Sequence, residues 1–299
     1  MQSPLPVILE VALNGATPPD RNPNVPRTPT EVAADGLRCL EAGAAIVHNH
    51  TDDRSFDGVT RSHDPQPYRE AWRAILDARP DALLYPTMTG GGPHTTIEER
   101  YGHVEALGRE GLAGLGLVDP GSVNLGFLER DGTPDASPIV YENSNADVRH
   151  MMDVCARLEL PISFSIFDGS FMRTAVAYAR AGRVRHGGIL KIYFGGPRAS
   201  FGLPPTRAAL LAYLDLMGDC GLPFSVAVLG GDVLETPVAR EALERGGHLR
   251  VGLEDYAGTD QPSNALLIER ARTLCDEVGR PMASASEARR ILQGGTRSD

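Results

Sequence analysis

Cysteine is scarce in this sequence, and long hydrophobic runs are missing. The 299 residues include 4 cysteines, which lie far apart and form no Cys-x-x-Cys pair. This spacing argues against a disulfide framework and against a thiolate zinc site. No stretch approaches the roughly 18 consecutive apolar residues of a membrane-spanning helix, and the N-terminal segment lacks the basic start of a secretory signal. We therefore expect a soluble, reduced protein of the cytoplasm that has no membrane partner.

Positive charge is also in short supply. Lys and Arg number 29 against 39 Asp and Glu, a formal net charge of −10. Nucleic acids attract basic protein faces, so we expect no nucleic-acid partner, although a local basic pocket for an anionic substrate stays compatible with this charge. The chain is 41% hydrophobic and 23% charged, a globular balance that excludes disordered, collagen-like and coiled-coil classes.

The glycine motifs of nucleotide-binding proteins are missing from the predicted turns. The glycine-rich turns at 89–93, 195–197 and 230–231 have neither the G-x-G-x-x-G nor the G-x-x-x-x-G-K-[ST] form. No G-x-S-x-G surrounds Ser122 or Ser170, so a nucleophile elbow is absent. The turns follow predicted strands, where backbone N–H groups can face a phosphate or carboxylate, but each is equally compatible with a simple turn.

A regular alternation of short apolar runs with amphipathic stretches is the main pattern that the sequence contains. The apolar runs predict strands at 7–14, 44–51, 82–88, 114–118, 162–167, 189–194, 224–229 and 249–254. The amphipathic stretches predict helices at 30–42, 66–78, 97–109, 146–158, 171–181, 206–217, 237–245, 263–278 and 286–292. Thr96 and Ser263 are expected N-caps and Gly43 and Gly182 expected stops, whereas Thr30 has no partner for a capping box.

Eight strands that alternate with eight helices predict an α/β fold, a (β/α)8 TIM barrel. We expect a single domain over residues 1–299 with a short C-terminal helical extension. Several strands are continuous apolar runs, as parallel strands covered on both faces should be. A doubly wound open sheet is the alternative. The long connection 119–145 is expected to be a lid or a part of the site.

The sharpest candidate for a site is His48-Asn49-His50 at the end of the second predicted strand. Because side chains alternate along a strand, both imidazoles face the same side, which in a barrel is the interior. Two imidazoles that face inward favour water or a cation between them, so the pattern indicates a metal site. Two hydrogen-bonded structural histidines are the alternative. The other histidines are weaker candidates, in a loop or on a polar helix (63, 94, 103), or on helix surfaces and strand starts (150, 186, 248).

The second candidate is the segment from Arg250 to Asp255. On a strand, Arg250, Gly252 and Glu254 would share one face, and Gly252 would leave room for a substrate or a neighbouring side chain. A buried guanidinium needs a carboxylate or an anionic ligand. Glu254 could complete a set of two histidines and one carboxylate with an open coordination position. A structural Arg–Glu ion pair is the alternative.

Over nearly its whole length the sequence resembles the β-keto acid cleavage enzymes, whose first characterised activity is 3-keto-5-aminohexanoate cleavage. The similar segments are 12–16, 24, 28–29, 41–44, 48–50, 89–91, 121–124, 246–255, 263–264, 279–280 and 287–289. The most specific of them is Gly-Gly-His-Leu-Arg-Val-Gly-Leu-Glu-Asp at 246–255.

The resemblance implies a zinc-containing barrel that reacts a β-keto acid with acetyl-CoA to give acetoacetate and a new acyl-CoA. His48, His50 and Glu254 would then hold Zn²⁺ or another divalent transition metal, and Arg250 with Asp255 would form the acid–base pair. A homo-oligomer is expected. The residues expected to contact substrate are Asn14, Thr87, Thr89, Gly90, Ser122, Asn124 and Ser165.

Within this resemblance the metal polarises the 3-keto oxygen and Asp255 removes a proton from C2. The enolate attacks the acetyl thioester, and the released CoA thiolate attacks the 3-keto carbon in a retro-Claisen cleavage. Thr89 and Ser122 are expected to hydrogen-bond the substrate carboxylate or an oxyanion.

Three positions depart from the family pattern. Ser165 stands where members that take amino-bearing keto acids have a glutamate, so a cationic substrate is not expected. Asp52-Asp53 replaces an Arg-Asp pair, and Gly231-Asp232 replaces a turn that often carries arginine, so the residues that contact CoA are left open. An amidohydrolase-like zinc hydrolase and a barrel that only binds a ligand or a structural metal are the alternative functions.

Overall fold

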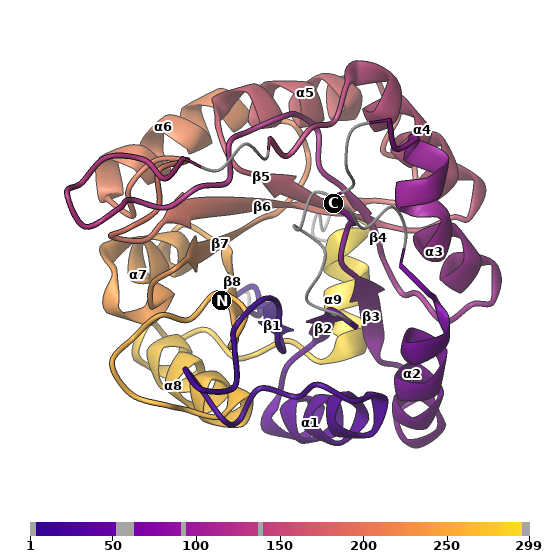
Figure 1. Ribbon diagram of the computed structural model, residues 1–299, viewed down its shortest axis with the longest axis horizontal. Coiled ribbons are helices and arrows are strands. Elements are labelled where there is room, and N and C mark those ends of the chain that lie inside the picture. The colour runs from indigo at the N-terminus through magenta and orange to yellow at the C-terminus, as the bar shows by residue number, and fades with distance from the viewer. Residues whose placement is uncertain (1–3, 52–62, 91–93, 137–139, 295–299) are drawn as a thin grey trace.

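The computed structural model describes residues 4–51, 63–90, 94–136 and 140–294. In these ranges, eight parallel strands form a nearly closed barrel in the order β3-β2-β1-β8-β7-β6-β5-β4, and α-helices surround it (Figure 1). The seam lies between β3 and β4, where the Gly114 backbone N–H donates to the Leu84 carbonyl at 2.8 Å. The predicted (β/α)8 fold is confirmed, and the open doubly wound sheet is wrong.

The strands are short, and every residue in them is buried except the last residue of β7. Their bounds are β1 Leu9–Ala12, β2 Ile46–Asn49, β3 Leu83–Pro86, β4 Gly116–Val118, β5 Ile162–Ile166, β6 Gly188–Gly195, β7 Phe224–Leu229 and β8 His248–Val251. All eight lie in predicted strands or extend them by one residue. Burial on both faces explains why they appear in the sequence as apolar runs without alternation.

The helices lie on the outside of the barrel and turn an apolar face toward the strands (Figure 1). Their bounds are α1 Pro29–Ala42, α2 Gln66–Ala78, α3 Ile97–Arg109, α4 Asn145–Arg157, α5 Gly169–Arg180, α6 Arg207–Met217, α7 Pro237–Glu244, α8 Asn264–Glu277 and α9 Ala285–Leu292, with a short 3₁₀ turn at Val233–Glu235. Each differs from its prediction by at most two residues at either end.

Local capping sets several of these helix ends. Thr96 and Ser263 are the N-caps of α3 and α8, as predicted. Thr28, rather than Thr30, caps α1, and its hydroxyl and Glu31 form a reciprocal capping box. The prediction that α1 lacks a capping box is wrong because Pro29 already occupies the first helical position, which moves the cap back by two residues.

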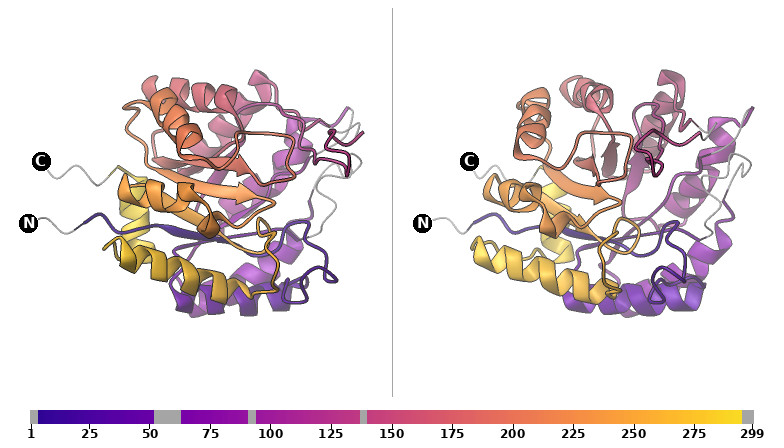
Figure 2. Two further views of the ribbon diagram at one scale, coloured as in Figure 1. Left: turned by 90° about the vertical axis from the view of Figure 1, so that its left-hand side faces the viewer. Right: turned by 60° about the vertical axis from the view of Figure 1, so that its left-hand side comes forward.

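The C-terminal helix α9 packs against the end of the barrel where the strands begin (Figure 2). The contact is close, since a Cβ on Gly187, the residue before β6, would lie 1.9 Å from the Leu292 carbonyl oxygen. The opposite end of the barrel therefore stays available for loops and a site. None of the helices in the described ranges is long and apolar enough to cross a membrane. The division into one domain over residues 1–299 and the self-association stay predictions.

The connection between β4 and α4 crosses the open end of the barrel. Isolated antiparallel β-bridges pair Val123 with Tyr141 and Phe127 with Ala199. The first bridge joins two parts of this connection, and the second joins it to the segment after β6. Leu125 and Phe127 line a cavity at the mouth of the barrel. This agrees with the expectation that the long connection forms part of the site.

Candidate active site

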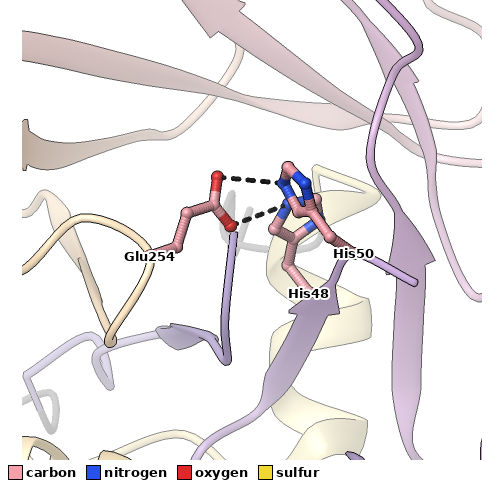
Figure 3. A group of neighbouring side chains, drawn as sticks. All are labelled: His48, His50 and Glu254. Atoms are coloured by element: carbon pink, nitrogen blue, oxygen red, sulfur yellow. Dashed lines mark ion pairs between the residues drawn. The ribbon is translucent and has the colours of Figure 1, made fainter. Parts of the chain in front are cut away.

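His48, His50 and Glu254 meet at the mouth of the barrel (Figure 3). His48 is on β2, His50 follows β2 directly, and Glu254 lies in the turn after β8. His48 Nε2 lies 3.1 Å from Glu254 Oε2, and His50 Nε2 lies 3.3 Å from Glu254 Oε1. One ligand atom from each residue lies within 4.8 Å of the other two. The three residues predicted to bind metal are therefore brought together.

The donor atoms of this triad fit a divalent cation. The Nδ1 atom of His48 faces the Tyr85 carbonyl at 3.3 Å, so Nδ1 carries the proton and the Nε2 lone pair faces Glu254. Burial lowers the pKa of His48 to about 4, although Glu254 opposes the change, so this imidazole is neutral near pH 7. Within the described ranges, His50 Nε2 and Glu254 Oε2 are buried and form no hydrogen bond of good geometry. A divalent cation between these atoms would satisfy both of them.

Neighbouring side chains hold the two histidines in place. The Asn14 amide accepts from the His50 N–H at 2.8 Å and donates to the His50 carbonyl at 3.0 Å. The Trp72 indole donates to the Asn49 side chain at 2.8 Å. The Asn49 amide in turn donates to the His50 carbonyl at 3.0 Å, so Trp72 of α2 anchors the end of β2 that carries the two histidines.

Arg250 connects the triad to Asp255. Its Nε and Nη2 donate to the two Asp255 carboxylate oxygens at 2.7 and 3.0 Å, and Nη2 lies 2.9 Å from Glu254 Oε1. Burial would raise the pKa of Glu254, but Arg250, His50 and His48 outweigh it and hold the pKa well below its usual range. Burial raises the pKa of Asp255, and Arg250 opposes that rise.

The turn after β8 corrects one sequence-based interpretation. Glu254 was expected on the same strand face as Arg250 and Gly252, but β8 ends at Val251 and the Tyr256 N–H donates to the Gly252 carbonyl at 3.0 Å. Gly252 has φ of +138°, and a Cβ there would lie 2.1 Å from the Ala12 carbonyl oxygen. The glycine therefore makes room for the β1 backbone rather than for substrate, and Glu254 reaches the site from a turn.

A buried ionic network below the triad was not anticipated from the sequence. Strand register places Glu10 of β1 beside Arg250 of β8, and Ser165 of β5 beside Lys191 of β6. Glu10 Oε1 lies 2.8 Å from Arg250 Nη1 and 3.2 Å from Lys191 Nζ, and the Tyr85 hydroxyl donates to Glu10. Burial would raise the pKa of Glu10, but Lys191 and Arg250 lower it to about 2. In the sequence, this network is indicated only by single charged residues within predicted apolar strands, namely Glu10, Lys191 and Arg250.

Replacing Lys191 with Met is expected to destabilise the fold. The Lys191 and Glu10 side chains are each 2% exposed, and the loss of one partner leaves a buried charge under-compensated, which costs about 3 kcal/mol. The urea midpoint of unfolding should fall, and adding Glu10→Gln should recover part of the loss. Arg183→Met is the control, because it breaks an exposed pair with Asp153 and should leave the midpoint nearly unchanged. An unchanged midpoint for Lys191→Met would contradict this account.

A cavity of about 390 Å³ opens above the triad, and His50, Glu254 and Asp255 form its floor. Its walls are mainly apolar or aromatic and come from several loops: Leu125, Phe127, Tyr141, Phe167, Tyr193 and Phe201. A small molecule in this cavity would meet two carboxylates, one imidazole and a largely apolar wall. Such a lining is typical of sites where a few polar groups orient a ligand.

The residues predicted to contact substrate lie at different depths. Thr89 is buried with an unpartnered hydroxyl, and Ser165 is buried on β5. Ser122 exchanges hydrogen bonds with the Asn143 backbone, and Asn124 is exposed. Thr87 is buried just after β3, and Gly90 is partly exposed. Residues 91–93, which follow Gly90 directly, lie outside the described residues, as do Asp52 and Asp53. Their roles toward substrate, like that of Asn14, stay predictions.

Two of the weaker histidine candidates are more buried than the sequence indicated. His63 lies in a loop and His103 on α3, as expected, but both side chains are buried. Their rings pack 5.0 Å apart, and His103 donates from Nε2 to the Thr87 carbonyl at 2.7 Å. Burial lowers the pKa of His63 to about 3 and that of His103 to about 4. These neutral rings fill the space behind β3 instead of facing solvent.

The fold and the site define a barrel enzyme with a two-histidine, one-carboxylate group at the carboxyl ends of its strands. The sequence profile of the beta-keto acid cleavage enzyme family matches residues 6–293. The chain belongs to this family, and the resemblance inferred from the sequence is confirmed. The amidohydrolase alternative is not favoured, because in the described residues no histidine follows β5 or β6 directly.

Individual relatives agree with this assignment. The chain is 29% identical over 294 residues to a 3-keto-5-aminohexanoate cleavage enzyme of Acetoanaerobium sticklandii, covering 96% of this chain and 97% of that protein. It is 30% identical over 294 residues to a 3-oxoadipate:acetyl-CoA acetyltransferase of Cupriavidus necator, covering 96% and 94%. A solved structure with a similar fold is that of ObcA in a ternary complex with a C4-CoA adduct and oxalate, with a TM-score of 0.64 and 17% sequence identity. The match covers 90% of this chain and 67% of that chain, and it supports the fold.

Proposed function

We propose that this protein is a metal-dependent enzyme that reacts a β-keto acid with acetyl-CoA to give acetoacetate and the CoA ester of the remaining acyl group. The observation that carries the proposal is the position of Asp255, held by Arg250, beside the His48-His50-Glu254 group, with His50, Glu254 and Asp255 lining one cavity. The family match and the C. necator relative, an acetyl-CoA acetyltransferase by name, support the same reaction class.

The triad accounts for activation of the ketone. His48, His50 and Glu254 would hold Zn²⁺ or another divalent transition metal. A cation there acts as a Lewis acid that acidifies the C2 hydrogens of a 3-keto acid. Lys191 and Arg250 each lie beside Glu10, so the charge of this carboxylate is already compensated before a cation binds to the triad.

Asp255 is positioned to move the proton. Its carboxylate faces the cavity, and Arg250 holds it by two hydrogen bonds. The proton leaves C2 for Asp255, and its bonding electrons form the enolate. The enolate carbon forms a bond to the acetyl carbonyl carbon as the C–S bond breaks and releases the CoA thiolate. Thr89, whose hydroxyl is buried and unpartnered, is proposed to donate to an oxygen of the substrate.

The cleavage step regenerates the enzyme. The CoA thiolate adds to the 3-keto carbon of the original substrate, and the bond between C2 and C3 breaks to release the acyl-CoA. The electrons of that bond form the enolate of acetoacetate, which takes back the proton from Asp255. Protons and electrons therefore balance without an outside oxidant or reductant.

The cavity favours an uncharged or apolar group on the keto side of the substrate. Its walls are mostly apolar, and Ser165 offers a hydroxyl rather than a carboxylate. Asp119 is the carboxylate next to Ser165, and burial raises its pKa, although the hydroxyls of Tyr141 and Ser165 oppose the rise. Asp119 already accepts from the Tyr141 hydroxyl and does not line the cavity, so an ammonium group beside Ser165 would be poorly compensated.

The test uses acetyl-CoA labelled with ¹³C in both acetyl carbons and a panel of β-keto acids. We expect acetoacetate that carries the label at C3 and C4, because only those carbons come from acetyl-CoA. Keto acids with apolar or hydroxylated tails should react at least about tenfold faster than their amino-bearing analogues, because the ammonium group of the latter would be poorly solvated in the cavity. Failure of every keto acid to give labelled acetoacetate with metal-loaded protein would refute the proposal, and CoA-independent hydrolysis would favour the hydrolase alternative.

A further inference from the structure

We infer that Arg21 and the polar cavity beside it bind the pantetheine-diphosphate arm of the thioester co-substrate. This inference rests on the proposed function and names the route by which acetyl-CoA reaches the site. The cavity measures about 300 Å³ and lies between the loop after β1 and the loop after β8. It shares Thr17 and Arg21 with the central cavity, so the two cavities adjoin at these residues.

The lining of this second cavity suits an amide-bearing arm. Thr259 and Gln261 are exposed and supply polar groups along it, whereas the Asn22 amide is already bonded to Pro262 and Asn24. The central cavity is mostly apolar and carries Glu254 and Asp255 at its floor. A thioester arriving from the side of Thr17 would place its acetyl group at that floor and leave its amide groups in the polar cavity.

Arg21 supplies the positive charge that a diphosphate needs. The side chain is exposed, and among the described residues its guanidinium makes one hydrogen bond, from Nη2 to the Tyr256 carbonyl at 3.0 Å. A guanidinium has five N–H donors in a planar fork, so the others remain for phosphate oxygens. Asp260, the acidic residue in this cavity, is paired with Arg270 at 2.6 Å and accepts from the Tyr256 hydroxyl. Its charge is therefore already compensated.

The other cavity at the mouth of the barrel does not suit a diphosphate. It measures about 580 Å³ and is lined by the glycine turns after β6 and β7. Asp232 and Glu235 also line it, whereas no Lys or Arg lines it in the part of the chain that the structure describes. Although glycine turns can present N–H groups to phosphate, two carboxylates without a cation repel one. We therefore do not assign the phosphates to the glycine turns at 195–197 and 230–231.

Steady-state kinetics of Arg21→Ala test the inference. The KM for acetyl-CoA should rise about tenfold, as expected for the loss of a charge-assisted hydrogen bond. The KM for the β-keto acid should change much less than the KM for acetyl-CoA, because Arg21 lies where the two cavities adjoin and contacts none of the triad residues or Asp255. The increase should shrink as salt is added, because an exposed ion pair is screened.

The same variant should show no defect with S-acetylpantetheine, which lacks the phosphates. Arg198→Ala is the matched control: Arg198 is an exposed arginine after β6 whose guanidinium bonds the Leu128 carbonyl, and it lines neither cavity. An unchanged KM for acetyl-CoA in Arg21→Ala, or an equal rise in Arg198→Ala, would overturn the inference. An inactive wild-type protein would instead refute the proposed function, so the two failures are distinguishable.

Discussion

Metal-free protein is expected to form acetoacetate at least about 10³-fold more slowly than metal-loaded protein, since a Lewis acid stabilises developing charge by several kcal/mol. The reason lies in the donor set, where the lone pairs of His48 and the Glu254 carboxylate face one another at 3.1 Å. Dialysis against a chelator should remove one metal equivalent per chain, and adding Zn²⁺ should restore the rate. Elemental analysis measures the metal independently of activity.

Variants separate loss of the metal from general damage by the chelator. His50→Ala should lose both the metal and the activity, because Nε2 of His50 is one of the three donor atoms. His186→Ala is the control, since His186 precedes β6 at the opposite end of the barrel and should retain one metal equivalent. Active protein without bound metal would rule out this mechanism.

Asp255→Asn is expected to lower kcat by about 10³-fold, within the range that general-base catalysis supplies. The amide keeps the size of the carboxylate and one acceptor for Arg250, but it cannot take a proton at neutral pH. Metal content should stay at the wild-type level because the triad is intact. The change therefore separates proton transfer from metal binding.

Deuterium exchange isolates the step assigned to Asp255. In D₂O without acetyl-CoA, the wild-type protein should accelerate exchange of the C2 hydrogens of the keto acid, and Asp255→Asn should not. Asp232→Asn serves as the control, because Asp232 lines a different cavity and lies outside the central one. If Asp255→Asn exchanged the C2 hydrogens as fast as the wild-type protein, the base would have to be another residue.

Much of the fold was predictable from local pattern. Both ends of β7 and of helices α2 and α3 coincide with their predictions, because apolar runs and amphipathic periodicity act over a few residues. The pair of inward histidines was predictable for the same reason, since alternation along one strand places positions 48 and 50 on one face. Glu254 was a candidate partner from its place at the end of the last predicted strand, and the family resemblance pointed to the same residue.

The ionic network and the route past Arg21 were not predictable in this way. Glu10, Tyr85 and Lys191 are on β1, β3 and β6, and nothing in their local sequence indicates that they meet. Their contact depends on the register of several strand pairs and on closure of the barrel. Arg21 likewise becomes a cavity residue only because the loops after β1 and β8 lie side by side.

By itself, the sequence determined the alternating elements, the barrel they build and the pair of inward histidines at the end of β2, since each depends on interactions between residues close along the chain. The tertiary structure alone decided that β8 ends at Val251, that Glu254 approaches the histidines from a turn, and which charges are buried together. The physical reason is that a buried charge is stable only beside its partner. In this barrel the partners come from strands up to 240 residues apart in the chain.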